Sequence, residues 1–196
     1  MDKTDAILIR KFRFSETSIL CIWLTEGFGK VKTSARGALK PGGAFHGKID
    51  LFYQAEIGFV RSRSGEIHAL REVLLREPFN GNGASYANLA VASYFAELCD
   101  AITEPMAVND GLYDLLLRAV RYLGANAPTY RAILHFESEL CRLLGILHEH
   151  TDPAHSLAQH AGRLPAGRQT AIKAVRERPE RVISASVAPT IDKSQT

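Results

Sequence analysis

Polar and apolar positions follow two different periods along the chain, and the first is the period of two that is typical of β-strands. The first 75 residues contain five segments rich in β-branched and aromatic residues, separated by turn residues. No intervening segment is long enough for the helical crossover that joins parallel strands, so the pattern predicts a small antiparallel barrel. An OB-fold has five strands, and an SH3-like barrel fits nearly as well. We expect strands at residues 5–14, 17–25, 29–36, 50–60 and 66–73.

The clearest part of this pattern is a hairpin at residues 17–36. Turn residues at 26–29 separate its two strands. From Lys30 to Ala35, polar side chains alternate with small apolar ones, which predicts that Lys30 and Lys32 share one outward face. A basic face over an apolar back suits contact with a polyanion, but lysines that merely solvate an exposed face would give the same pattern.

Beyond residue 84 the apolar positions recur with the helical period of 3.6. Helices are expected at 85–102, at 110–123, from Thr129 through Leu147, and at about 166–177. Each long helix carries one apolar stripe, which must be buried against another helix or against the barrel. The breaker-rich run EPFNGNG at 77–83 separates the two periods. The predicted fold class is therefore α+β: a five-stranded antiparallel barrel at 1–77, an all-α helical domain at 84–178, and a flexible tail at 179–196.

Composition and charge narrow the class of protein. The chain is 46% apolar and 23% charged, as in ordinary soluble globular proteins, and has no apolar run long enough to cross a bilayer. Three widely spaced cysteines indicate reduced thiols rather than disulfides. We therefore expect a cytoplasmic protein with no membrane contact. Residues 1–75 carry 12 Lys and Arg against 8 Asp and Glu, whereas residues 76–150 carry 5 against 9. This asymmetry favours nucleic-acid contact by the first part, although ordinary scatter of surface charge could also produce it.

The barrel part offers a candidate nucleic-acid surface. Binding requires cations that contact phosphates, with aromatic side chains nearby on which bases can stack. The aromatic candidates are Phe12, Phe14, Phe28, Phe45 and Tyr53, although most aromatic residues of a small barrel lie in its core. The candidate phosphate-binding cations are Arg10, Arg13, Lys30, Lys32, Arg36, Lys40, Lys48, Arg61 and Arg63.

Metal and catalytic sites are not expected. The potential ligands His148, His150, His155, His160, Cys141 and Asp152 include neither a C-x-x-C pair nor an H-E-x-x-H helix. Because Pro153 interrupts the helical phase, a solvated polar loop is the better interpretation. No G-x-S-x-G, Walker, G-x-G-x-x-G or paired-carboxylate motif is present. We predict a non-enzyme without cofactor, in which Cys21 is a buried structural thiol.

Several short motifs, taken in order, resemble the RecO family of bacterial recombination mediators. The resemblance covers about residues 5–147. The matching pieces are S-E-T-S at 15–18, G-K-V-K-x-x-A-R-G at 29–37, Gly47-Lys48, Gly65-Glu66-Ile67, Leu70-Arg71-Glu72, Tyr94 to Leu98, Phe136-Glu137 and Leu143-Leu144-Gly145. The resemblance implies an OB-fold followed by a helical domain. It implies that the protein is associated with the nucleoid. It also implies binding of single- and double-stranded DNA, annealing of complementary strands, and work with RecR to load the recombinase on coated strands.

The resemblance further implies that the helical domain grips the acidic, apolar-tipped tail of single-stranded DNA-binding protein. Candidate residues for that contact are Arg118, Arg121, Arg131 and Arg142. The chain departs from the family pattern in three ways. Only Lys40 and Lys48 flank a loop that is usually rich in cations, which predicts weaker and more salt-sensitive DNA binding. Leu134-His135 stands where relatives often have an Arg, and the four cysteines of a zinc site common in the family are absent.

Three other functions remain open on the residues alone. The barrel and helices could serve only protein contacts, as in an adaptor that ignores DNA. The barrel could instead bind RNA, as other OB-folds do. A metal-dependent enzyme is the most distant alternative.

Overall fold

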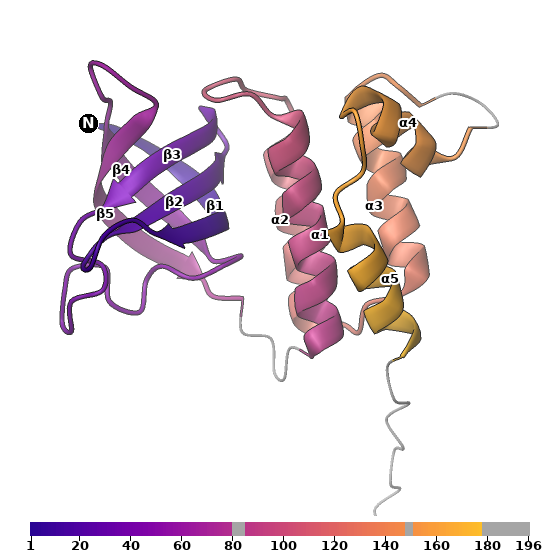
Figure 1. Cartoon of the computed structure of the whole chain (residues 1–196), viewed down its shortest axis with the longest axis horizontal. Coiled ribbons are helices and arrows are strands. Elements are labelled where there is room, and N and C mark those ends of the chain that lie inside the picture. Colours follow the sequence, from indigo (N-terminus) through magenta and orange to yellow (C-terminus); the bar gives the residue numbers. More distant parts are fainter. Residues whose placement is uncertain (80–84, 148–150, 178–196) are drawn as a thin grey trace, which may run out of the picture.

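The computed structural model describes residues 1–79, 85–147 and 151–177, and five strands come first in this part of the chain (Figure 1). They close a barrel in the order β1-β2-β3-β5-β4, which confirms the expected barrel. The first three strands follow one another as antiparallel neighbours. The strands are β1 (Asp2–Arg13), β2 (Ile19–Thr25), β3 (Gly29–Ala35), β4 (Gln54–Val60) and β5 (Ile67–Glu77).

One strand pair differs from the predicted all-antiparallel barrel. β3 and β5 run parallel over three residue pairs, from Lys32↔Ile67 to Ser34↔Ala69. The reason is the long connection after β3, residues 36–53, which carries the chain across the barrel so that β4 pairs with β1. The β4–β5 hairpin then returns β5 alongside β3 in the same direction. The remaining four pairs of neighbouring strands in the barrel are antiparallel.

The barrel interior is filled by inward-facing residues of all five strands, with Leu8, Trp23 and Phe59 among the most buried. Trp23 donates its indole N–H to Thr33 Oγ1 at 2.9 Å, so the one polar atom of this ring has a partner in the core. Phe45, from the connection between β3 and β4, belongs to the same apolar cluster. That connection is therefore anchored against the barrel by a side chain.

Five helices follow, and the first three begin close to where the sequence predicts. Ser85 caps the first helix in a capping box with Asn88, and Thr129 caps the third by accepting from the backbone N–H of Ala132. In the described part of the chain, no helix is both long and apolar enough to cross a bilayer. The helices are α1 (Tyr86–Ile102), α2 (Leu112–Ala125), α3 (Tyr130–Leu143), α4 (Pro153–His160) and α5 (Gly167–Arg176).

Two expectations for the helical part are wrong. The third helix ends at Leu143 rather than near Leu147, because Gly145 adopts a left-handed conformation (φ 67°) and forms a Schellman turn with the last carbonyls. Residues 153–160 are a helix, not a solvated loop. Pro153 stands at the first helical position, which tolerates proline, and Asp152 caps the helix by accepting from Ala154 N–H at 3.1 Å.

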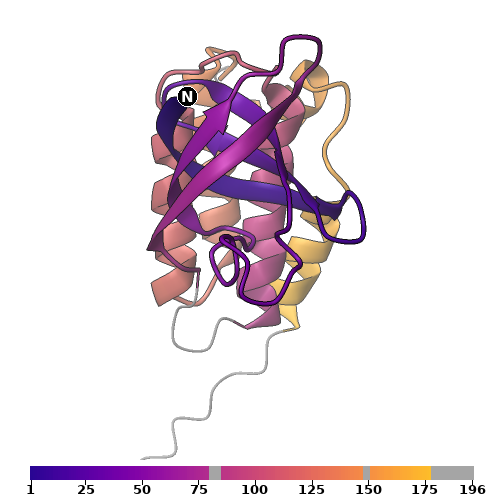
Figure 2. The same ribbon diagram turned by 90° about the vertical axis from the view of Figure 1, so that its left-hand side faces the viewer.

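The barrel and the helices share one apolar core. Ile7, Ile9, Ile22 and Leu24 point outward from β1 and β2 and join the cluster formed by α1, α2 and α3. In Figure 2 the barrel lies in front of the helices, and Figure 1 shows α1 and α2 next to the barrel with α3, α4 and α5 beyond them. The division of the chain into domains at residues 77 and 84 stays a prediction, and the tail at 179–196 lies outside the described residues.

Candidate nucleic-acid interface and partner pocket

The nine predicted phosphate-binding cations do not lie on one face. Arg61 and Arg63 belong to the β4–β5 turn, beside the start of β1, where Arg61 contacts Asp2 at 2.8 Å. Arg13 and Arg36 lie at the opposite end of the barrel, where β1 and β3 finish. The 12 residues of β1 separate the two ends. One straight strand of nucleic acid therefore cannot use both groups within a single short contact.

Lys30 lies in the junction between barrel and helices rather than on an open face. Its side chain is 11% exposed, and its ammonium donates to Asp100 Oδ1 at 3.0 Å and to the Asp100 carbonyl at 2.7 Å. Arg10 reaches the other carboxylate oxygen of Asp100 at 2.6 Å. Burial raises the pKa of Asp100, but the hydrogen bonds from the two cations outweigh it, so this pKa lies below its usual value. Two of the nine cations are thus occupied in holding α1 against the barrel.

Lys32 forms an ion pair with a different carboxylate from the one that Lys30 contacts. Its ammonium contacts Glu66 at 2.6 Å in the β4–β5 turn. Strand alternation places both lysines on the outer face as predicted, but α1 covers that face at Lys30 and leaves it open at Lys32. The predicted continuous basic face of the hairpin is therefore interrupted.

Five of the nine predicted cations have no carboxylate partner among the described residues: Arg13, Arg36, Lys40, Lys48 and Arg63. The first three lie at the end of the barrel where β1 and β3 finish, whereas Arg63 lies in the β4–β5 turn. The side chains of Arg36, Lys40 and Lys48 make no hydrogen bond or ion pair within the described part of the chain, and the Arg13 side chain bonds only the Ser15 carbonyl. Register places Arg13 beside Ile19, which pairs with Ala35, the residue before Arg36. We call the surface formed by Arg13, Arg36, Lys40, Phe12, Phe14 and Leu39 the barrel-end patch.

A backbone bond joins the two segments of this patch. Leu39 N–H, in the connection after β3, donates to the Thr17 carbonyl in the β1–β2 turn at 3.1 Å. The turn that follows Phe14 is closed by a bond from the Phe14 N–H to the Ser18 carbonyl at 2.9 Å. Residues more than 20 positions apart in the sequence are therefore held as one surface. Leu39 was not among the predicted site residues, because nothing in the sequence indicates which segment lies beside it.

The aromatic candidates divide into buried and exposed rings. Phe45 lies in the barrel core, and Phe28 packs edge-on against Phe59 at a centroid distance of 5.5 Å. Phe12 and Phe14 are 42% and 55% exposed. Tyr53 packs, half-buried, against the core shared with the helices. Only the two phenylalanines near the end of β1 present large open faces among these five rings.

A pocket in the helical part brings together two of the four predicted partner-binding arginines. Arg118 of α2 and Arg131 of α3 line a cavity of about 400 Å³, and neither makes an ion pair within the described residues. Its apolar lining includes Phe95 and Phe136, whose rings stack at 3.9 Å between centroids. His135 also lines this pocket. We call this cavity the partner pocket.

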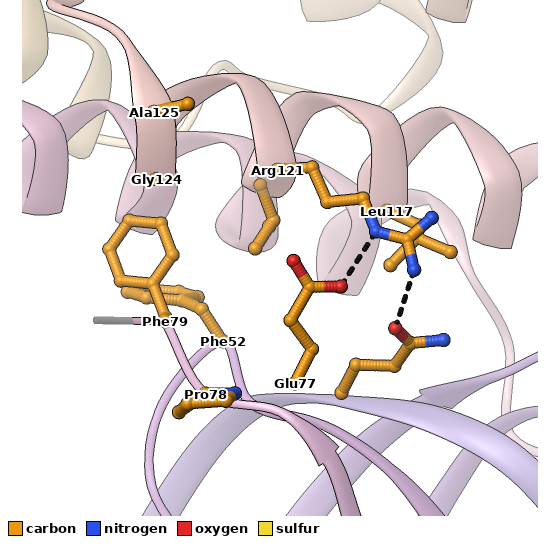
Figure 3. A pocket seen from close by; sticks show the side chains of 10 residues that line it. Phe52, Glu77, Pro78, Phe79, Leu117, Arg121, Gly124 and Ala125 are labelled. Atoms are coloured by element: carbon orange, nitrogen blue, oxygen red, sulfur yellow. Dashed lines mark hydrogen bonds and ion pairs between the residues drawn. The ribbon is translucent and has the colours of Figure 1, made fainter. Parts of the chain in front are cut away.

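The other two arginines lie elsewhere. Arg121 points toward the barrel, where it donates to Glu77 at 2.8 Å and to Gln54 at 3.0 Å across a second cavity of about 250 Å³ (Figure 3). Phe52 and Phe79 form part of the wall of that cavity. Arg142 is paired with Glu139 on its own helix. The structure thus separates the predicted set of four into a pair that shares a pocket and two residues with other contacts.

A buried charge network fastens α5 to the helical bundle. Glu137 is fully buried and accepts from the Tyr94 hydroxyl at 2.6 Å and from Arg168 Nε at 2.7 Å and Nη2 at 3.2 Å. Burial, with the Glu137 charge beside it, raises the pKa of Tyr94, so its hydroxyl stays a donor. The hydrogen bond to Glu137 raises the pKa of Arg168. Three helices meet at this network, which fixes one wall of the partner pocket through the neighbouring Phe136.

The candidate metal ligands are only partly within the described residues. His155 and His160 lie exposed on α4, and His148 and His150 lie outside the described part. No cluster of three or more His, Cys, Asp or Glu suited to a metal is found among the described residues. Burial raises the pKa of the Cys21 thiol to about 12 and that of Cys141 to about 11, so both stay protonated near neutral pH.

Comparison with known families matches both halves of the chain. The family model described as Recombination protein O N terminal matches residues 1–79, and the model described as Recombination protein O C terminal matches residues 83–157. The chain belongs to the RecO family. The resemblance noted from the short motifs is thereby confirmed, and the RecO C-terminal match ends within α4, before α5.

Individual RecO relatives agree with this assignment. The chain is 29% identical to the DNA repair protein RecO of Rhodopirellula baltica over 71% of its own length and 52% of that protein. It is 29% identical to RecO of Desulforudis audaxviator over 73% and 56% of the two chains. It is 30% identical to RecO of Symbiobacterium thermophilum over 72% and 55%. The chain thus spans about half the length of the curated RecO proteins it matches.

Proposed function

We propose that this protein is a non-enzymatic DNA repair and recombination mediator that binds single- and double-stranded DNA and anneals complementary strands. The match of its two halves to the two RecO family models carries the proposal. The curated relatives are named DNA repair proteins, and the barrel-end patch offers a surface on which DNA could bind. Action in the cytoplasm, at the nucleoid, follows from that role.

The physical basis of annealing would be neutralisation of charge. Two strands repel each other through their phosphates, and bound cations lower that repulsion while releasing counterions to the solution. Arg36, Lys40 and Lys48 suit this role because they make no ion pair within the described residues. Lys30 and Arg10 suit it less, since a phosphate would have to displace the Asp100 carboxylate. No nucleotide hydrolysis or metal ion is required for such a step.

We also propose that the partner pocket takes the acidic, apolar-tipped tail of single-stranded DNA-binding protein. An apolar side chain can enter the cavity lined by Phe95 and Phe136, while carboxylates of the tail pair with Arg118 and Arg131. Cooperation with RecR to load the recombinase would build on these two surfaces. RecR itself has no assigned contact here.

The test is a fluorescence-anisotropy titration of labelled single- and double-stranded DNA at several salt concentrations. The variant Arg36→Gln/Lys40→Gln/Lys48→Gln is expected to weaken binding of both. It is expected to reduce the slope of log K against log salt by about 2 for the single strand, at about 0.7 per lost phosphate contact. A matched control, Arg131→Gln/Arg142→Gln/Lys173→Gln, removes three charges elsewhere and should leave the slope unchanged.

The alternatives predict different results in the same titration. A protein adaptor would bind no DNA even at low salt. An RNA-binding barrel would release DNA when RNA of equal length is added in equal amount. Equal loss of affinity in the Arg36, Lys40 and Lys48 variant and in the control would show that DNA responds to net charge alone.

A further inference from the structure

We propose that the barrel-end patch also binds the bases of single-stranded DNA, by stacking them on Phe12 and Phe14. This inference rests on the proposed DNA-binding function and deepens it. Phosphate contacts alone do not distinguish a single strand from a duplex. Stacking does, because a duplex hides the faces of its bases inside the helix. The patch would therefore prefer single strands for a reason other than charge.

The first support is exposure in the right electrostatic setting. Phe12, Phe14 and Leu39 are 42%, 55% and 45% exposed, and the backbone of Leu39 is bonded to the turn that follows Phe14. Large apolar side chains exposed as a group mark a binding surface more often than single ones do. The neighbouring cations Arg13, Arg36 and Lys40 have no carboxylate partner among the described residues. Aromatic faces beside unpaired cations are the combination that sequence-tolerant single-strand binding uses.

The second support is spacing. Phe12 and Phe14 are two residues apart where β1 passes into the turn, and the Phe14 N–H bond to Ser18 continues the hairpin pairing. Two residues of an extended strand span about 6.8 Å. Stacked bases in a duplex strand are about 3.4 Å apart. The two rings therefore match neighbouring bases of a strand that has been spread, and they do not match neighbouring bases of an intact duplex.

The third support is that Phe12 is held in place and has space beside it. The Arg10 guanidinium lies 4.9 Å from the centre of the Phe12 ring, while the same guanidinium is fixed by Asp100 at 2.6 Å. Phe12 also lines a cleft of about 590 Å³ between the barrel and the helices, whose far wall includes Arg163. Pockets of that size hold molecules larger than a nucleobase. A base on Phe12 could thus be covered from the helical side.

The test compares Phe12→Ala and Phe14→Ala with the unaltered protein, using single-stranded and double-stranded DNA of equal length. Each substitution is expected to lower single-strand affinity at least about fivefold and to leave duplex affinity unchanged. Leu74→Ala is the matched control, because Leu74 is 53% exposed on β5 and lies outside the patch. Phe14→Trp gives a second readout: its fluorescence should be quenched by a single strand, against the constant signal of the buried Trp23.

The outcomes separate this inference from the proposed function. If Phe12→Ala and Phe14→Ala bind single strands as tightly as the unaltered protein while the Arg36, Lys40 and Lys48 variant binds weakly, stacking is wrong and DNA binding stands. If both phenylalanine variants lose affinity for single strands and for duplex equally, the rings maintain the shape of the surface and do not stack on bases. That result also contradicts the stacking proposal. If the unaltered protein binds no DNA, the proposed function fails first.

Discussion

Lys30, in the middle of the β2–β3 hairpin, is bonded to Asp100 at the end of α1, 70 residues away in the sequence. Asp100 also receives Arg10 from β1, so one carboxylate joins two barrel strands to a helix. A residue that looks like a solvent-facing cation in the sequence is in fact a structural contact. The consequence can be measured as stability.

Asp100→Asn should lower the free energy of unfolding by about 1–3 kcal/mol at pH 7, because it leaves the nearly buried Lys30 without its counter-charge. The pKa of Asp100 lies below the ordinary value of about 3.9, so its stabilisation is present above that pH and is lost as pH falls through the lowered pKa. Urea unfolding from pH 7 to pH 3 should show the difference between the two proteins shrinking below about pH 4. Asp50→Asn, which loses only an exposed pair with Lys11, should cost no more than about 1 kcal/mol.

Removing one member of the Glu137–Arg168 pair should be far more costly. Arg168→Met leaves a fully buried carboxylate whose one remaining partner among the described residues is the Tyr94 hydroxyl, and we expect a loss of about 3–5 kcal/mol in the free energy of unfolding, measured by chemical denaturation. Glu137→Gln/Arg168→Met should cost less than the sum of its two single changes, because no unpaired charge remains. Arg142→Ala, at an exposed pair, is the control. A loss for Arg168→Met as small as that control would show that α5 is not fastened by this network.

The two classes of helical-domain arginine should behave differently toward a peptide with acidic residues and an apolar C-terminal residue. Arg118→Ala and Arg131→Ala should each weaken binding about tenfold in isothermal titration calorimetry, because each removes a charge-assisted contact at the partner pocket. Arg121→Ala and Arg142→Ala should bind as the unaltered protein does. Equal effects in all four variants would indicate general attraction between opposite charges, which added salt would abolish.

His68 should make stability depend on pH in the range where histidine titrates. Burial and the nearby Arg61 charge lower its pKa, and its Nδ1 accepts the Ser62 N–H at 3.2 Å. The unfolded chain therefore binds a proton more readily, and the free energy of unfolding should fall as pH drops below about 6.5. Thermal unfolding between pH 7.5 and 5 would measure this. His68→Gln should remove that part of the dependence, whereas the exposed His46→Gln should not.

The sequence predicts secondary structure here better than it predicts contacts. Alternation and helical periodicity are local properties, and they place all five strands and the three long helices. The parallel β3–β5 pair is not local, because it depends on how residues 36–53 cross the barrel. The helix at 153–160 was missed although its signal is present: Asp152 followed by Pro153 is a helix start as well as an interruption.

The contacts of the predicted site residues could not be foreseen for a similar reason. Alternation correctly puts Lys30 on the outer face of its strand, but it cannot reveal that the end of α1 covers that face. Helical spacing likewise does not distinguish Arg118 from Arg121 as candidate partner-binding residues. In the structure Arg118 lines the partner pocket, whereas Arg121 contacts Glu77 of the barrel. In each case the contact depends on which element packs alongside, and the charge pattern of a single element does not reveal that neighbour.

Part of the outer surface of the barrel is buried in the core that it shares with the helices. The residues that form this part are Ile7, Ile9, Ile22 and Leu24. A fragment ending at residue 79 would therefore expose an apolar stripe to solvent. The same core joins the barrel, which carries the barrel-end patch, to the helices that line the partner pocket. A strand of DNA and a peptide tail that belong to one assembly would therefore meet two sites on packed elements of one chain. Avidity would then depend on whether the linker of that assembly spans the gap between the two sites.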